Sequence, residues 1–209
     1  ALNINTKPAP SLVSTAKASP PCARYTITSQ SGASCWLNNV RLATEAFPPR
    51  NIWLGVSIED KKRVDERAMV LSATPAAIRF WSVEPLLEDL GNIRGYLEQN
   101  VDWVIVGGES GHGARSCNID WVRSVVEQCC AGDVPCFVKQ LGSNVECAND
   151  DVAEWLDQRG LGYLQLGPTE RFQGAPGRVF GFNDKKGGDT DEWPADLRVR
   201  EFPIEESTP

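Results

Sequence analysis

The chain has 209 residues, of which 41% are hydrophobic and 23% charged, and a formal net charge of -7. This length suits one domain with a substantial core, and the composition is that of an ordinary globular protein. The acidic balance argues against a nucleic-acid partner, because nucleic-acid-binding proteins usually present a basic face. No apolar stretch approaches the ~20 residues that cross a bilayer, and the amino end has no apolar signal core. We therefore expect a soluble cytoplasmic protein.

The first 47 residues are predicted to be poorly committed to structure. They are rich in Pro, Ser, Thr and Ala, and such a mixture buries too little apolar surface to offset the entropy lost on ordering. Within them Tyr25–Thr28 alternates weakly between polar and apolar residues, which predicts one short strand.

Residues 48–142 are predicted to form strands that alternate with helices. Such alternation at intervals of roughly 25–30 residues is typical of right-handed βαβ units on a parallel sheet. We therefore predict an α/β fold, a partial (β/α) barrel or half-barrel with about four parallel strands. The predicted strands are the apolar runs Asn51–Ile58, Ala77–Val83, Val101–Val106 and Cys136–Lys139.

Capping residues mark where two of the intervening helices begin. Asp60 precedes a helix whose inward face carries Val64, Ala68 and Leu71. Asn118 precedes a second helix that ends at Gly132, and Ile93–Gln99 is a weaker helical stretch between them. The inward residues of the second helix are predicted to be Ile119, Val122, Val126 and Cys129.

Residues 143–209 are predicted to be a small extension that packs on the half-barrel. Asp151–Gln158 is predicted to be a short helix, and Tyr163–Leu166 a short strand.

The predicted strands end in a repeated polar pattern. Ligands of parallel α/β folds bind where the strands end, so three carboxylates and one ammonium group are expected to converge at one mouth. Because such groups are costly to bury alone, the pattern predicts that they bind a cation, a ligand amine or ligand hydroxyls. The candidate residues are Ser57, Glu59, Glu84, Gly107, Gly108, Glu109, Lys139 and Gln140.

A plainer interpretation stands beside this one. Each carboxylate either caps the next helix or pairs with a nearby arginine, such as Arg67, Arg79 or Arg115. The glycine-rich segment 107–113 lacks the dinucleotide fingerprint and the Walker pattern, so it predicts no specific phosphate site. The single histidine, His112, lies in this segment and is expected to face solvent.

The seven cysteines are irregularly spaced, and no two of them are separated by the two-residue gap typical of zinc and redox sites. We therefore expect reduced, partly buried thiols rather than ligands. They are Cys22, Cys35, Cys117, Cys129, Cys130, Cys136 and Cys147.

Several motifs in one order carry a family resemblance. They are NIWLGVSIEDKKRVDER, TPAAIRFWSVEPLL, VDWVIVGGESGHGARSCNIDWVRS, FVKQLG and the ending DKKGGDTDEWPADLRVREFP. The chain resembles the C-terminal half of a phage-associated protein family of unknown function, which is itself similar to radical S-adenosylmethionine enzymes of the spore photoproduct lyase type. The resemblance covers residues 48–142 and 171–203.

The resemblance implies S-adenosylmethionine laid across the strand ends. Ser57 and Glu59 match the strand that contacts the ribose, and Lys139 and Gln140 match the substrate side. Glu84 with Pro85, and Gly107–Glu109, lie on the strands between. Members of the wider family carry a three-cysteine segment that binds a [4Fe–4S] cluster. Residues 1–47 contain only Cys22 and Cys35, so radical chemistry by this chain alone is not expected.

Three functions are therefore weighed: a cluster-less relative that keeps a nucleoside pocket, a scaffold or interaction module that forms homo- or hetero-oligomers, and a metal-assisted hydrolase built on the three carboxylates. A partner chain could supply the cluster.

The first strand of the half-barrel also needs a neighbour, because a free strand edge invites association. Either Tyr25–Thr28 pairs with Asn51–Ile58, or the chain dimerises through that edge.

Overall fold

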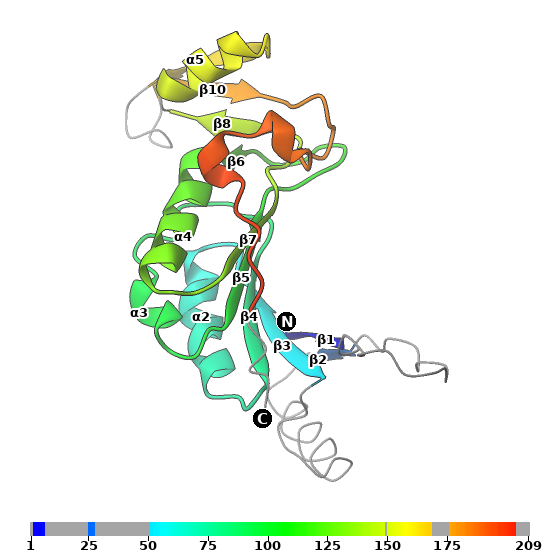
Figure 1. Cartoon of the computed structure of the whole chain (residues 1–209), viewed down its shortest axis with the longest axis vertical. Helices are drawn as coiled ribbons and strands as arrows, with labels where there is room; N and C mark the ends of the chain where they lie inside the picture. The colour runs from blue at the N-terminus through cyan, green and yellow to red at the C-terminus, as the bar shows by residue number, and fades with distance from the viewer. Residues whose placement is uncertain (1, 7–24, 28–50, 149, 169–175, 204–209) are drawn as a thin grey trace, which may run out of the picture.

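The computed structural model describes residues 2–6, 25–27, 51–148, 150–168 and 176–203. These residues form two β-sheets and their covering helices (Figure 1). The larger sheet has six strands in the order β2-β1-β3-β4-β5-β7, and the smaller has four in the order β6-β8-β10-β9.

Four adjacent parallel strands form the body of the larger sheet. They lie side by side in the order β3, β4, β5 and β7, and each strand runs parallel to its neighbours. This confirms the predicted α/β class and the four parallel strands, each of which falls within a residue or two of its predicted apolar run. The bounds are β3 Ile52–Ser57, β4 Ile78–Val83, β5 Trp103–Gly107 and β7 Cys136–Gln140.

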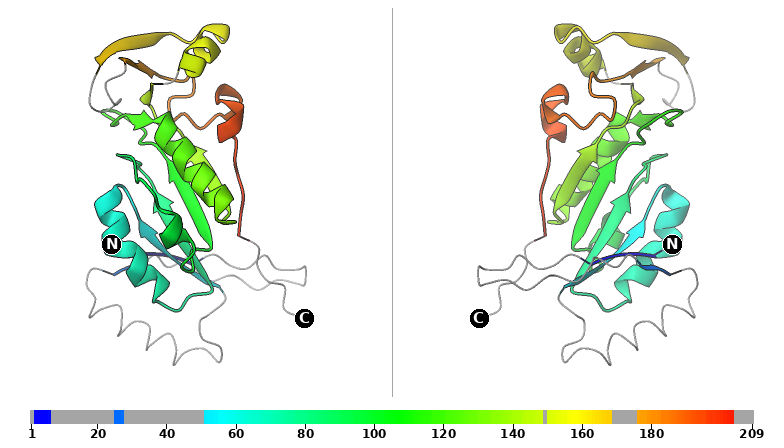
Figure 2. Two further views of the ribbon diagram at one scale, coloured as in Figure 1. Left: turned by 90° about the vertical axis from the view of Figure 1, so that its left-hand side faces the viewer. Right: turned by 90° about the vertical axis from the view of Figure 1, so that its right-hand side faces the viewer.

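Three helices cover one face of these strands (Figures 1 and 2). Helix α2 spans Lys61–Ser72, α3 spans Arg94–Leu97 and α4 spans Ile119–Ala131. The predicted caps are confirmed, since the Asp60 side chain accepts from the backbone N–H of Arg63 and the Asn118 side chain accepts from that of Asp120. Both side chains satisfy donors that have no partner within the helix.

Alternation along the strands gives the parallel sheet two unlike faces. The face under the helices is mostly aliphatic apart from the buried Trp81, with Leu54, Val83, Val104 and Val138 at 4% exposure or less. The opposite face, called here the helix-free face, carries alternate residues of the same strands. Its members are Trp53, Gly55, Ser57, Ile78, Phe80, Ser82, Trp103, Ile105, Phe137 and Lys139.

An N-terminal hairpin continues the sheet beyond β3. Strand β1 (Leu2–Thr6) pairs antiparallel with β3, and β2 (Tyr25–Ile27) pairs antiparallel with β1. The short strand predicted at Tyr25–Thr28 is found as Tyr25–Ile27, with Thr28 outside the described residues. The alternative in which it pairs with β3 is wrong, because Leu2–Thr6 takes that edge. The strand at residues 2–6 is not among the predicted elements, although Leu2 and Ile4 alternate with Asn3 and Asn5 as in a half-buried strand.

The C-terminal segment closes the opposite edge of the parallel sheet. The backbone N–H of Val138 donates to the carbonyl of Val199, and that of Glu201 donates to the carbonyl of Cys136. The Glu201 carboxylate also accepts from the backbone N–H of Cys136 at 3.1 Å. Both edges of the four parallel strands are thus paired with other parts of the same chain.

The smaller sheet lies beyond the strand ends of the larger one, at the top of Figure 1. The first strand of this sheet, β6, precedes α4 in the chain. The sheet therefore combines residues of the predicted half-barrel, 48–142, with residues of the predicted extension, 143–209. The predicted helix and strand of this region are confirmed as α5 (Asp150–Gln158) and β9 (Tyr163–Pro168). The other strands were not predicted; they are β6 (Cys117–Asn118), β8 (Val145–Cys147) and β10 (Pro176–Phe180).

Two short 3-10 helices, η2 (Thr190–Glu192) and η3 (Ala195–Leu197), carry the chain back to β7. The Trp193 side chain between them is fully buried, and its Nε1–H donates to the Gly187 carbonyl at 3.0 Å. Among the described residues, no helix is long and apolar enough to cross a membrane.

Candidate functional site

The predicted site residues all lie at the carboxyl ends of the four parallel strands or in the loops that follow them. Each carboxylate among them has a cationic partner. The predicted site residues therefore lie together at one end of the sheet. Because the carboxylates are paired, much of their negative charge is already neutralised within the protein.

Glu59 follows β3 and pairs with the helix after it. Its Oε2 lies 3.0 Å from Nη1 of Arg67 on α2, and the same guanidinium donates to the Ser57 carbonyl. Both side chains of the pair are about a quarter exposed, at 28% for Glu59 and 23% for Arg67. The pairing with Arg67 is the plainer interpretation that the sequence left open.

Glu109 follows β5 and is held at both oxygens by Arg115. Oε2 accepts from Nε at 2.8 Å and from the backbone N–H of Arg115 at 2.9 Å, while Oε1 accepts from Nη2 at 3.2 Å. The side-chain and backbone hydrogen bonds from Arg115 lower the pKa of Glu109 to about 2. Glu109 therefore closes the loop that leads to β6, as the plainer interpretation predicts.

The charges of the first and third strands also meet. The pKa of Arg115 is raised, first by its hydrogen bond to Glu109 and in smaller part by the charge of Glu59. A carboxylate that follows β3 thus acts on a guanidinium that follows β5, and the strand ends form one electrostatic unit.

Glu84 and Lys139 form an ion pair that crosses over a strand. Lys139 Nζ on β7 lies 3.1 Å from Glu84 Oε2 at the end of β4, and β5 runs between the two. Gly107 of β5 permits this, because a Cβ there would lie 3.1 Å from Glu84 Oε1 and 2.8 Å from the Gln140 carbonyl oxygen. Glu84 is only 15% exposed, whereas Lys139 is 54% exposed.

Gly108 and Gln140 have a packing role. A Cβ on Gly108 would lie 2.3 Å from the Leu141 carbonyl oxygen, so only glycine allows the ends of β5 and β7 to approach this closely. The Gln140 Nε2–H donates to the Gly108 carbonyl at 3.1 Å and fixes that approach.

Two further features of this edge are not among the predicted site residues. Ser82 lies directly beside Ser57 on neighbouring strands and faces the same side. Below these serines the helix-free face carries an aromatic floor, here defined as Trp53, Phe80, Trp103, Phe137 and Phe202. Alternation along the predicted strands could have located four of these rings, because they occupy every second position.

Trp103 is the centre of the aromatic floor. Its ring centroid lies between 5.5 and 6.1 Å from those of the other four rings. Its Nε1–H donates to the Glu201 carbonyl at 2.9 Å, which ties the floor to the C-terminal segment. Arg200 of that segment lies over the Phe137 ring at 5.2 Å.

The remaining candidates are less informative. His112 is exposed in its loop, as expected. The five described cysteines are free thiols, while Cys22 and Cys35 lie outside the described residues. Within the described part of the chain, no group of three His, Cys, Asp or Glu side chains is placed to hold a metal ion.

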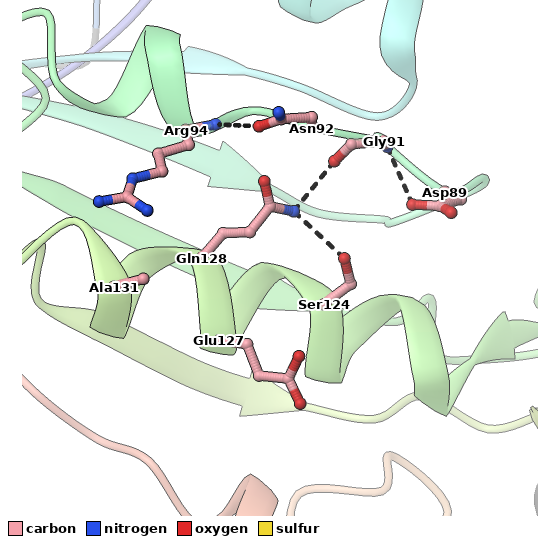
Figure 3. Close-up of a pocket in the computed structure, with 8 residues that line it drawn as sticks. All are labelled: Asp89, Gly91, Asn92, Arg94, Ser124, Glu127, Gln128 and Ala131. Carbon is pink, nitrogen blue, oxygen red and sulfur yellow. Dashed lines mark hydrogen bonds between the residues drawn. The ribbon is translucent and has the colours of Figure 1, made fainter.

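Figure 3 shows a surface cavity of about 500 Å³ on the helix side, between α4 and the loop before α3. The Gln128 amide spans it, donating to the Gly91 carbonyl at 2.9 Å and to Ser124 Oγ at 3.2 Å. Its carbonyl oxygen accepts from the backbone N–H of Ile93 at 2.7 Å. These bonds hold the loop to the helix, so the Gln128 amide has a structural role.

A larger cavity of about 710 Å³ lies at the amino-terminal edge of the sheet, far along the strands from the predicted site. Its wall includes the buried thiols of Cys129 and Cys136. A hydrogen bond from Cys136, together with burial, raises the pKa of the Cys129 thiol, so this thiol is protonated at neutral pH.

Comparison with known proteins gives one match. The profile of a family described as "Protein of unknown function (DUF5131)" matches residues 12–181. No curated protein and no solved structure matches the chain.

Proposed function

Because the chain belongs to the DUF5131 family, whose description assigns no activity, we propose a function from the site itself: binding of a nucleoside ligand of the S-adenosylmethionine type at the carboxyl edge of the parallel sheet. The observation that carries this proposal is the meeting of paired charges at the carboxyl ends of the strands with aromatic rings on the helix-free face. No step is proposed through an iron–sulfur cluster, since the described thiols form no group that could hold one.

The balance of charge at the edge suits a zwitterion. The three carboxylates of Glu59, Glu84 and Glu109 face three cations, Arg67, Lys139 and Arg115. A polyanion would meet as much repulsion as attraction there. A ligand with an ammonium group, a sulfonium group and a carboxylate can find a partner for each charge, because exposed ion pairs exchange partners at little cost.

Glu84 is the residue best suited to a ligand hydroxyl or cation. One of its oxygens is engaged by Lys139, and the other has no hydrogen bond to the described residues. Glu109, by contrast, uses both oxygens on Arg115. We therefore assign ligand binding to Glu84, assisted by Lys139 and Glu59, and assign to Glu109 the positioning of its loop.

The aromatic floor provides the second half of a nucleoside site. Phe80 and Trp103 are buried at 7% and 9% exposure, but Trp53 and Phe137 are partly exposed and lie on the same face as Ser57 and Ser82, further back along the strands. A planar base can pack against such rings, and base–aromatic stacking contributes about 1–3 kcal/mol per base. The ribose would then lie between the floor and the carboxylates.

The family resemblance supports this proposal, since it too implies a nucleoside across the strand ends. It extends the proposal to a phage-associated protein of radical S-adenosylmethionine ancestry, with any cluster supplied by another chain. The five free thiols agree with a reducing compartment such as the cytoplasm. A metal-assisted hydrolase is not proposed, because no described group of donors favours it.

The proposal is tested by ligand-dependent thermal unfolding. A ligand at a hundred times its dissociation constant adds ~2.7 kcal/mol to the free energy of unfolding. For a chain of this size the midpoint should rise by roughly 5–10 °C with S-adenosylmethionine. S-adenosylhomocysteine, which lacks the sulfonium charge, should give a smaller rise if the carboxylates contact that charge.

Two variants locate the binding site. Glu84→Gln should weaken binding at least tenfold by calorimetry. Glu98→Gln, which removes an exposed carboxylate paired with Arg94 on α3, should leave binding unchanged. The midpoint of each variant without ligand controls for folding. The absence of any shift in the wild-type protein, or an equal affinity in Glu84→Gln, would overturn the proposal.

A further inference from the structure

The two sheets differ in how far their edge strands are covered by other parts of the chain. In the larger sheet, β1 covers β3 and the C-terminal segment covers β7. In the smaller sheet, β6 is two residues long, and its side chains are buried. Strand β9, in contrast, is a six-residue terminal strand that pairs only with β10 among the described residues.

Strand β9 has few of the features by which proteins protect an edge, and its pairing with β10 is irregular only between Leu166 and Pro168. No charged residue occurs in Tyr163–Pro168, and proline stands only at its last position. Leu164 is 67% exposed, the largest value among the exposed large hydrophobic side chains described, and Tyr163 is 36% exposed. An apolar strand with one row of backbone groups available for pairing is a template for another strand.

The sequence of β9 is complementary to itself. Leu164-Gln165-Leu166 reads the same in both directions, so antiparallel pairing about a two-fold axis at Gln165 places each Leu164 opposite Leu166 of a second copy. Leu164 and Leu166 lie on one face of the strand, because side chains alternate. The pairing therefore builds a cluster of four leucines on that face and places the two Gln165 residues opposite each other on the other.

We propose that the chain forms a two-fold symmetric dimer by antiparallel pairing of β9 with β9 of a second copy. The isologous contact closes on itself, because both β9 edges are used within the dimer. A single six-residue strand buries less area than a standard protein interface, so the dissociation constant is expected in the micromolar range. The carboxyl edge of the parallel sheet plays no part in this contact, so the dimer is independent of nucleoside binding.

Sedimentation velocity over a concentration series tests the proposal. The wild-type chain should convert from monomer to dimer between about 1 and 100 µM. Leu164→Lys places a charge in the leucine cluster and should raise the dissociation constant at least tenfold. Met69→Lys is the matched control, because Met69 is a 52% exposed apolar side chain on α2, and it should leave the dimer intact.

Disulfide trapping tests the register. Directly opposed residues have Cβ atoms about 4.5–5.5 Å apart. Gln165→Cys should therefore form a covalent dimer under mild oxidation, above the level given by the native cysteines, whereas Leu164→Cys should not. A wild-type chain that stays monomeric at 100 µM, or a dimer that persists in Leu164→Lys without trapping at Gln165→Cys, would overturn the proposal.

Discussion

The two faces of the parallel sheet come from the same four strands and differ in almost every respect. Under the helices the side chains are mostly aliphatic and nearly fully buried, as at Val104 and Val138, and Trp81 is the buried aromatic exception. On the helix-free face the side chains are aromatic near the amino-terminal end of the strands and polar near the carboxyl end. Phe202, from the C-terminal segment, covers part of the aromatic floor and is itself 54% exposed.

This difference separates folding from binding within one sheet. The aliphatic face gains stability by removing apolar area from water, roughly 25 cal/mol for each Å². The helix-free face retains exposed or partly exposed rings at Trp53, Phe137 and Phe202, and the exposed ammonium group of Lys139. Substitutions on the first face should act on stability, and those on the second should act more on ligand affinity.

The largest effect is expected from neighbouring residues of β5 that face opposite ways. Val104→Ala should lower the free energy of unfolding by about 2–3 kcal/mol, because it leaves a cavity in a core position of 0% exposure. Ile105→Ala removes more atoms but should cost only about 1 kcal/mol, because Ile105 is partly exposed. Urea denaturation measures both. An equal or larger loss in Ile105→Ala would break the contrast between the faces.

A smaller effect is expected within the aromatic floor. Trp103→Phe keeps an aromatic ring but removes the hydrogen bond to the Glu201 carbonyl. The loss should be about 1 kcal/mol, the usual net value of such a bond. The C-terminal segment should also exchange its amide hydrogens faster, and hydrogen exchange at residues 199–201 measures this. Unchanged exchange there would show that the Trp103 bond does not secure the segment.

The smallest effect concerns the exposed carboxylate of Glu109. Its pKa of about 2 in the folded state lies below the value of about 4.3 expected in the unfolded chain. The unfolded state therefore binds the proton first as the pH falls, so the stabilising contribution is complete above pH ~4.5 and is lost towards pH ~2. In this window the wild-type free energy of unfolding should fall more steeply than that of Glu109→Gln.

Chemical denaturation at a series of pH values measures these slopes. Asp184, whose pKa is also lowered, first by the backbone N–H of Gly188 and then by that of Lys186, is present in both proteins. Its contribution cancels when the slopes are compared. Parallel slopes for the wild type and Glu109→Gln would show that Arg115 does not hold Glu109 in solution.

The parallel sheet could be predicted because the sequence signals for its strands and helices lie within short contiguous segments. Each strand is a compact apolar run, and the residues that cap the helices, Asp60 and Asn118, stand directly before them. Most of the second sheet could not be predicted, because β6, β8 and β10 are two to five residues long, and the paired residues of β8 lie 28 or more positions from those of β6 and β10. Nor does the pattern of Leu2–Thr6 indicate that it pairs with β3.

The positions of the candidate site residues could be predicted, but their ion-pair and hydrogen-bond partners could not. Parallel strands bring their carboxyl ends to one edge, so residue order alone located Glu59, Glu84 and Glu109. Their partners depend on three-dimensional detail. The ion pair between Glu84 and Lys139 exists because Gly107 leaves space above β5, and a packing glycine cannot be distinguished from a ligand-binding glycine by sequence alone.

The closure of the sheet by Val199–Glu201 has a consequence for synthesis in the cell. These residues are translated after every other strand that the structure describes, so the outer edge of β7 stays open until residues 199–201 have left the ribosome. A nascent protein in this state exposes a strand template to its neighbours on the polysome. Slow translation of the final stretch, or a bulky fusion directly after Phe202, would prolong that exposure and lower the yield of folded protein.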